Sequence, residues 1–211
     1  MPLVLGYHGC DLETAQALLG GSPFRPSTRD YDWLGAGVYF WENDVVRAYR
    51  WASEHRRNFT NPSVVGAAIE LGNCLELTTQ SGIEAVRLAY RQFVGMVGMI
   101  GDPIPENVDS AKGASGDKIV RRLDCAVMNC LFETQQTMQD LDSESQPYPA
   151  LPYDTVRALF PEGTELYPGA GFRDKTHIQI CIREPEQILG VFRIPQCQSE
   201  ELGLSALYGL S

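Results

Sequence analysis

The sequence predicts one domain of mixed α and β structure (class α+β). Short apolar runs of strand length alternate with segments that have the 3.6-residue periodicity of amphipathic helices. The chain has 211 residues, of which 44% are hydrophobic and 21% charged. A chain of this size and composition buries a full core without disulfides or metals. We expect a single domain over residues 1–195, followed by a C-terminal tail over residues 196–211.

The chain begins with a predicted buried strand over residues 3–7. Asp11 is suited to cap a following helix, which is expected to end at the glycine pair 20–21. His8 and Gly9 therefore lie at a junction between a strand and a helix.

A polar loop over residues 22–34 leads to the segment Gly35-Ala36-Gly37 and a second strand over residues 38–41. Because side chains alternate along a strand, Tyr39 is predicted on one face and Phe40 on the other. A helix with apolar residues at helical spacing is expected to follow, through Ala48 to Ala52.

The rest of the chain is predicted to hold two helices and several further strands. Glycine and asparagine at positions 72 and 73 favour a tight turn, so a hairpin is expected across them. The predicted strands cover residues 64–71, 74–77, 155–160, 176–183 and 188–194, and the predicted helices cover residues 83–97 and 118–137.

Charge and composition exclude several classes of protein. A net charge of −10 opposes general adhesion to nucleic acid or anionic membranes. No apolar run reaches the roughly 18 residues that a membrane span needs, and the first residues lack a basic leader region, so we expect a cytoplasmic protein. The six cysteines include no Cys-x-x-Cys pair, which predicts reduced thiols and no metal site.

Two of these segments together resemble a known family. Tyr7-His8-Gly9, followed by Gly35-Ala36-Gly37-Val38-Tyr39-Phe40 and an alanine-containing helix, is similar to the ADP-ribosyltransferases related to diphtheria toxin and to the poly(ADP-ribose) polymerases. The resemblance implies the ADP-ribosyltransferase fold, in which two small, mostly antiparallel sheets form an NAD cleft flanked by helices. It also implies that NAD is a substrate.

The resemblance assigns roles to the residues of both segments. His8 would bond the adenosine ribose, Gly9 would hold the nicotinamide amide through its backbone, and Tyr39 would stack on the nicotinamide ring. Gly37 and Phe40, in the same segment as Tyr39, are expected to line the cofactor site. The residue types agree, since an aromatic face suits a planar cationic ring and backbone groups read an amide.

The family's third element is a glutamate on a late strand, and here the aligned residue is Gln179. A glutamine can bond a ribose hydroxyl but offers no negative charge to an oxocarbenium-like transition state. His177 is two residues away and is expected on the same face of the strand, where it could act as a base or a phosphate contact. Gln179, His177 and Tyr39 are therefore the candidate catalytic residues.

The leading function is mono-ADP-ribosylation of a macromolecular acceptor, either protein or nucleic acid. The segment 161–175 is expected to determine which acceptor is modified. By analogy, a compact domain of this type suits a bacterial toxin or defence effector, with an antitoxin or inhibitor protein as a partner. Two alternatives stay open: an NAD glycohydrolase, and a non-catalytic module that binds NAD or ADP-ribose. An NAD-dependent RNA 2′-phosphotransferase is disfavoured because this acidic chain shows no basic groove.

Overall fold

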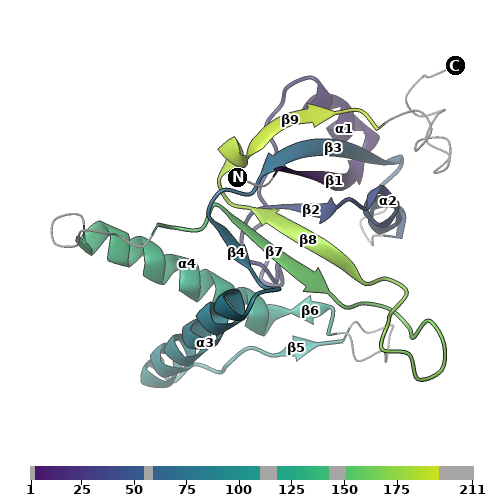
Figure 1. Cartoon of the computed structure of the whole chain (residues 1–211). Coiled ribbons are helices and arrows are strands. Elements are labelled where there is room, and N and C mark those ends of the chain that lie inside the picture. The colour runs from purple at the N-terminus through teal and green to yellow at the C-terminus, as the bar shows by residue number, and fades with distance from the viewer. Residues whose placement is uncertain (1–2, 55–58, 110–117, 143–150, 195–211) are drawn as a thin grey trace, which may run out of the picture.

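A computed structural model describes residues 3–54, 59–109, 118–142 and 151–194. These residues form an α+β domain with four α-helices, as the sequence predicts (Figure 1). The predicted tail over residues 196–211 lies outside the described residues. The elements are β1 (Leu3–Asp11), α1 (Leu12–Leu19), β2 (Val38–Glu42), α2 (Val45–Glu54), β3 (Pro62–Glu70), β4 (Cys74–Glu76), α3 (Gln80–Ile100), β5 (Asn107–Val108), β6 (Val120–Arg121), α4 (Arg122–Asp142), β7 (Thr155–Phe160), β8 (His177–Ile182), a 3-10 turn (Pro185–Gln187) and β9 (Ile188–Phe192).

Seven strands form one sheet in the order β4-β7-β8-β2-β1-β3-β9, and β5 pairs with β6 separately. Every neighbouring pair is antiparallel except β4 and β7. The strands are mostly antiparallel, as expected, but apart from β5 and β6 they form one continuous sheet and not two small ones. β8 pairs with β2 and joins the strands into one layer, although β1 and β2 pair only at Gly6↔Glu42 and Tyr7↔Trp41 before they diverge.

Helices cover both faces of the sheet (Figure 1). α1 packs with Cys10 and Val65 on one face, which we call the α1 face. α2 packs on the opposite face, with Tyr7, Trp41 and neighbours. α3 and α4 cover β7 and β8 on that same α2 face. Of the helices in the described part of the chain, none is long and apolar enough to cross a membrane.

Most predicted elements are confirmed, but one turn is wrong. Asp11 caps α1 by accepting a hydrogen bond from the Glu13 amide, at 3.3 Å, and β7 occupies the predicted residues. The hairpin across residues 72–73 does not form, because β4 pairs with β7 while β3 pairs with β1 and β9. Instead, the carboxylate of Asp154 accepts a hydrogen bond from the Asn73 amide at 2.7 Å.

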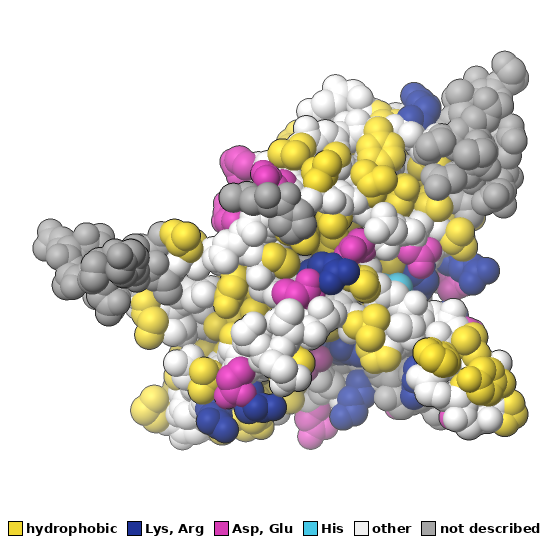
Figure 2. Space-filling view, viewed as in Figure 1, with side chains coloured by type: hydrophobic (Ala, Val, Ile, Leu, Met, Phe, Trp, Pro, Cys, Tyr) yellow, Lys and Arg dark blue, Asp and Glu magenta, His cyan; other side chains and the backbone are white. Residues whose placement is uncertain are grey.

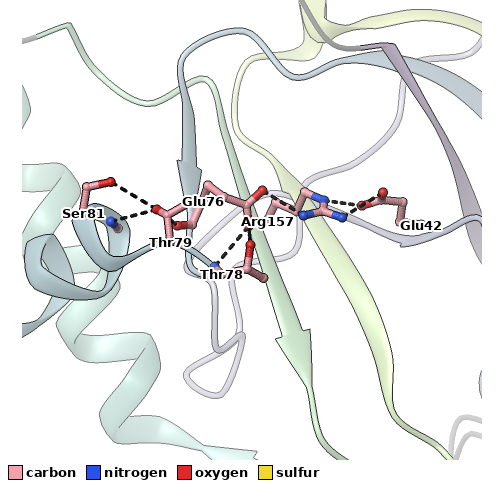
Figure 3. Close-up of polar contacts among 7 residues, drawn as sticks. Glu42, Glu76, Thr78, Thr79, Ser81 and Arg157 are labelled. Atoms are coloured by element: carbon pink, nitrogen blue, oxygen red, sulfur yellow. Dashed lines mark hydrogen bonds and ion pairs between the residues drawn. The ribbon is translucent and has the colours of Figure 1, made fainter.

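A charged network on the α1 face ties three strands together (Figure 3). Arg157 on β7 reaches across β8 to bond both carboxylate oxygens of Glu42 on β2. Its other guanidinium nitrogen donates to Glu76 on β4 at 2.9 Å. Thr78 donates to the second oxygen of Glu76 through its amide and its hydroxyl. The Arg157 side chain is only 19% exposed, so these contacts are screened less than surface ion pairs.

The network shifts the titration of its members. Burial raises the pKa of Glu76, but hydrogen bonds from Thr78 and Arg157 outweigh it, and the pKa is lowered overall. A lowered folded-state pKa means that Glu76 stabilises the fold above its unfolded pKa, about 4.3. This contribution is lost as the pH falls through the folded-state value.

Replacing Arg157 with methionine tests the network. At pH 7 the variant should lose about 2 kcal/mol of the free energy of unfolding, because two half-buried carboxylates remain without their cation. The loss should begin to shrink below about pH 4.3, where the unfolded chain takes up the proton, and the part due to Glu76 should vanish once the pH is below the lowered folded-state pKa. Urea denaturation from pH 3 to pH 8 measures this. The matched control is Arg87→Met, which removes an exposed helix pair with Glu84 and should cost less than about 0.5 kcal/mol; equal losses for the two variants would contradict the assignment.

Candidate functional site

The segments that suggested a site lie on three consecutive strands, β8, β2 and β1. Trp41 pairs with Gln179, and Tyr39 pairs with Cys181. Directly opposed residues share a face of the sheet. Gln179 and His177 therefore lie on the α2 face with Tyr39, as alternation along the strand predicts.

His8 lies on the α1 face, where its ring packs against Phe24 and Phe40 at centroid distances of 5.3 and 5.6 Å. His8 Nδ1 donates to the Tyr39 carbonyl at 2.9 Å, in the gap where β1 and β2 diverge. Burial lowers the pKa of His8 despite this bond, so the ring is neutral at pH 7 and Nε2 remains an acceptor. The structure thus links His8 to Tyr39 through the backbone, but the His8 and Phe40 side chains do not share a face with Gln179.

Two of the motif glycines, Gly9 and Gly37, are required by close packing. A Cβ at Gly9 would lie 2.3 Å from the carbonyl oxygen of Ala48 in α2. A Cβ at Gly37 would lie 2.5 Å from both Cys181 Sγ and the Ile182 carbonyl oxygen. Gly9 therefore lets α2 pack closely on β1, and Gly37 lets β8 lie close to the start of β2. The sequence predicted that these glycines contact a ligand and did not predict this packing role.

The Tyr39 hydroxyl anchors the loop that precedes β2. It accepts a hydrogen bond from the Leu34 amide at 3.0 Å and donates to the Gly35 carbonyl at 2.8 Å. Burial raises the pKa of Tyr39 well above its ordinary value, so the phenol stays protonated. Because the hydroxyl is already bonded, only the half-buried ring of Tyr39 is left to contact a ligand.

A directed chain of hydrogen bonds connects Trp33, Gln179 and His177. The Trp33 indole N–H donates to Gln179 Oε1 at 2.7 Å, and an indole can only donate. Gln179 Nε2 is therefore the donor to His177 Nε2, at 2.9 Å. His177 Nδ1 donates in turn to the Lys175 carbonyl at 2.6 Å. This pattern fixes His177 as a neutral imidazole with its proton on Nδ1.

The surroundings of His177 agree with a neutral ring. Burial lowers its pKa, and Arg47 lowers it further, while the bond to Lys175 and the Glu162 carboxylate oppose this. Glu162 Oε2 lies 3.9 Å from His177 Nδ1 and 2.5 Å from a guanidinium nitrogen of Arg47. Arg47 thus neutralises the carboxylate nearest to the His177 ring.

Two buried donors near this cluster have no hydrogen-bond partner in the described part of the chain, namely Trp41 Nε1 and Arg47 Nε. Trp41 is 3% exposed, and its ring centroid lies 6.2 Å from that of His177. Unpaired buried donors are uncommon in folded proteins and call for an acceptor such as water or a ligand.

Sequence reasoning did not identify Trp33, Arg47 or Glu162. Trp33 precedes the glycine segment in a loop that has no periodic pattern. Arg47 occupies a position of α2 that the apolar spacing alone assigns to solvent. Glu162 belongs to a turn after β7, and its pairing with Arg47 spans 115 residues, so no local signal marks these three residues.

The segment 161–175 forms an ordered projecting loop. Glu165 pairs with Arg173 as an isolated bridge, and the Leu166 amide donates to the Phe172 carbonyl at 3.1 Å. Leu166 and Tyr167 are each 58% exposed, and Phe172 is 68% exposed. Figure 2 shows hydrophobic side chains gathered on the lobe at lower right, where Figure 1 draws this connection between β7 and β8.

Thiol and metal chemistry have little support in the described part of the chain. Burial raises the pKa of the Cys10 and Cys181 thiols to about 12, so neither is a thiolate nucleophile. Within the described ranges, no group of three or more His, Cys, Asp or Glu residues could hold a metal ion. The cysteines that the structure describes are free thiols, as predicted.

Comparison with known proteins gives little further information. The chain matches no protein-family model, and no solved structure matches it significantly. It is similar to a protein of Methanocaldococcus jannaschii named "Uncharacterized protein MJ0359", with 23% identity over 202 residues. The alignment covers 86% of this chain and 83% of the archaeal protein.

The protonation state of His177 can be measured directly. We expect ¹⁵N NMR of the imidazole to show the proton on Nδ1 at pH 7 and a pKa below 6.5. Because this pKa is lowered, His177 should reduce the free energy of unfolding as the pH falls below about 6.5, where the unfolded chain binds the proton more readily. His177→Gln should remove that part of the pH dependence. An Nε2-protonated ring at pH 7 would contradict the hydrogen-bond chain.

Gly9→Ala should destabilise the protein by roughly 1–3 kcal/mol, because the added methyl group meets the α2 backbone and not a movable side chain. Chemical denaturation measures this loss. Gly95→Ala in α3 is the matched control, since nothing lies within 4 Å of the Cβ position there. That control should gain about 0.5–1 kcal/mol from the better helix propensity of alanine, and a harmless Gly9→Ala would show that α2 does not pack as described.

Proposed function

We propose that this protein binds NAD on the α2 face, beside β1, β2 and β8, and transfers ADP-ribose to a macromolecular acceptor. One observation carries the proposal. The three segments that resemble the ADP-ribosyltransferases are separated widely in sequence, yet they lie on consecutive strands of one sheet. The ADP-ribosyltransferase fold itself is part of this proposal.

The bonding of Gln179 suits a ribose. An amide offers two N–H donors and two acceptor lone pairs. Trp33 and His177 each use one of these positions, which leaves one donor and one acceptor on a half-buried side chain. Two neighbouring hydroxyl groups of a ribose could use both, as the aligned glutamate of the family would.

The unpaired donors supply a second argument. Trp41 Nε1 and Arg47 Nε are buried, and both residues adjoin the His177 and Glu162 cluster. Ribose or phosphate oxygens of NAD would satisfy them. His8 lies on the opposite face of the sheet, so it would act on this site only through its hydrogen bond to the Tyr39 carbonyl.

The projecting loop favours a macromolecular acceptor. Leu166, Tyr167 and Phe172 expose apolar and aromatic surface beside the start of β8, and such surface is typical of docking regions. In the reaction, an acceptor atom bonds C1 of the nicotinamide ribose as the glycosidic bond breaks. Nicotinamide leaves with the bonding electron pair, and the acceptor's proton passes to solvent.

A second candidate function is NAD or ADP-ribose binding without turnover. It is favoured by Gln179, which is neutral and already bonded to two side chains. The carboxylate nearest to His177 is neutralised by Arg47. A site of this kind recognises ribose but gives little stabilisation to developing positive charge.

The test uses labelled NAD with a total cell lysate, followed by nuclease or protease treatment to identify the labelled polymer. Gln179→Ala should lower turnover about tenfold with little change in NAD affinity, because it removes roughly one hydrogen bond that strengthens in the transition state. Gln179→Glu should raise nicotinamide release. Gln16→Ala, on the exposed surface of α1, is the control.

Each candidate function gives a different result. NAD binding by calorimetry without nicotinamide release supports the binding module. Free ADP-ribose from NAD alone supports a glycohydrolase. If NAD does not bind, or if Gln179→Ala keeps full transfer activity, the proposed site is wrong.

A further inference from the structure

A separate cavity lies where the loop before β2 meets α4 and the end of β8. Its volume is about 400 Å³, which suits a small organic molecule. Its lining includes none of His8, Tyr39, His177 or Gln179. The lining residues include Thr28, Arg29, Asn129, Phe132, Glu133 and Arg183.

Two arginines give this cavity its character. The Arg183 guanidinium carbon lies 3.6 Å from the centroid of the Phe132 ring, and its Nε donates to the Tyr153 carbonyl at 3.2 Å. Arg29 donates to the Tyr31 hydroxyl at 2.7 Å. Neither arginine forms an ion pair with any carboxylate in the described part of the chain.

Unpaired arginines are unexpected here because the chain has a net charge of −10. Elsewhere Arg47, Arg122 and Arg157 each form an ion pair with a carboxylate. Burial lowers the pKa of Arg183, and the nearby Glu184 carboxylate offsets only part of this effect. The stacking on Phe132 compensates part of that cost, and an anion would compensate more.

We propose that this cavity binds a small organic monophosphate, with the phosphate group between Arg29 and Arg183. A phosphate carries a charge of about −1.5 to −2 at pH 7, which matches two guanidinium groups better than a single carboxylate does. The Thr28 hydroxyl and the Asn129 amide add donors to the lining. With Glu133 on the same lining, the cavity holds two positive side chains and one negative side chain, so one phosphate group is attracted and a diphosphate fits less well than a monophosphate ester.

The site is independent of the proposed NAD site, so either can fail without the other. The two share only the loop before β2. Ala36 lines the cavity, while Trp33 of the same loop bonds Gln179.

The experiment is calorimetric titration of the full chain with phenyl phosphate, whose ring can lie against the Arg183 and Phe132 pair, and with inorganic phosphate. Binding should weaken at least tenfold in Arg29→Gln and in Arg183→Gln, because each substitution removes a charge-assisted hydrogen bond. Arg91→Gln is the control, since it makes the same charge change on an exposed part of α3.

Thr28→Trp should block the cavity without changing the charge. Circular dichroism melting confirms that each variant is folded, and Arg29→Gln and Thr28→Trp test the site even if Arg183→Gln does not fold.

Four results would overturn the proposal. The first is no binding of either probe at millimolar concentration. The second is equal loss in Arg91→Gln, which would indicate general charge attraction. The third is loss of phenyl phosphate binding in Gln179→Ala together with unchanged binding in Arg29→Gln and Arg183→Gln. That result would place the probe at the proposed NAD site. Benzoate binding as tight as phenyl phosphate would overturn the choice of phosphate.

Discussion

Backbone hydrogen bonds between β2 and β8 join the first quarter of the chain to its last quarter, and the candidate site depends on this pairing. The register sets Trp41 opposite Gln179 and Tyr39 opposite Cys181. A slip of one residue would move Gln179 and His177 to the α1 face. Gly37 permits this register, because any side chain there would collide with β8.

Charge is arranged differently on the two faces of the sheet. On the α1 face, Arg157 holds β7 against β2 and β4 through Glu42 and Glu76. On the α2 face, Arg47 pairs with Glu162 beside a neutral His177, and donors are left over. A fully satisfied network rigidifies a fold, whereas a network with spare donors can bind an acceptor. This contrast is why we place the ligand on the α2 face and assign a structural role to the Arg157 network.

The loop before β2 connects the two proposed ligand sites. Tyr39 fixes Leu34 and Gly35, Trp33 bonds Gln179, and Ala36 lines the arginine cavity. A ligand that moves this loop would alter the orientation of the Gln179 amide. The loop is therefore the physical element through which one site could influence the other.

The sequence by itself determined the features that local rules govern. The Asp11 cap, β7 over residues 155–160 and the shared face of His177 and Gln179 follow from capping preference and from alternation along a strand. Tertiary structure decided the rest, because pairing between distant segments has no local signal. It replaced the hairpin at residues 72–73 with pairing between β4 and β7, joined the strands into one sheet, and put His8 on the opposite face from Gln179. Only tertiary structure brought Trp33 to Gln179 and Glu162 to Arg47. These contacts join residues that are far apart in the sequence, so they depend on how separate elements pack against one another.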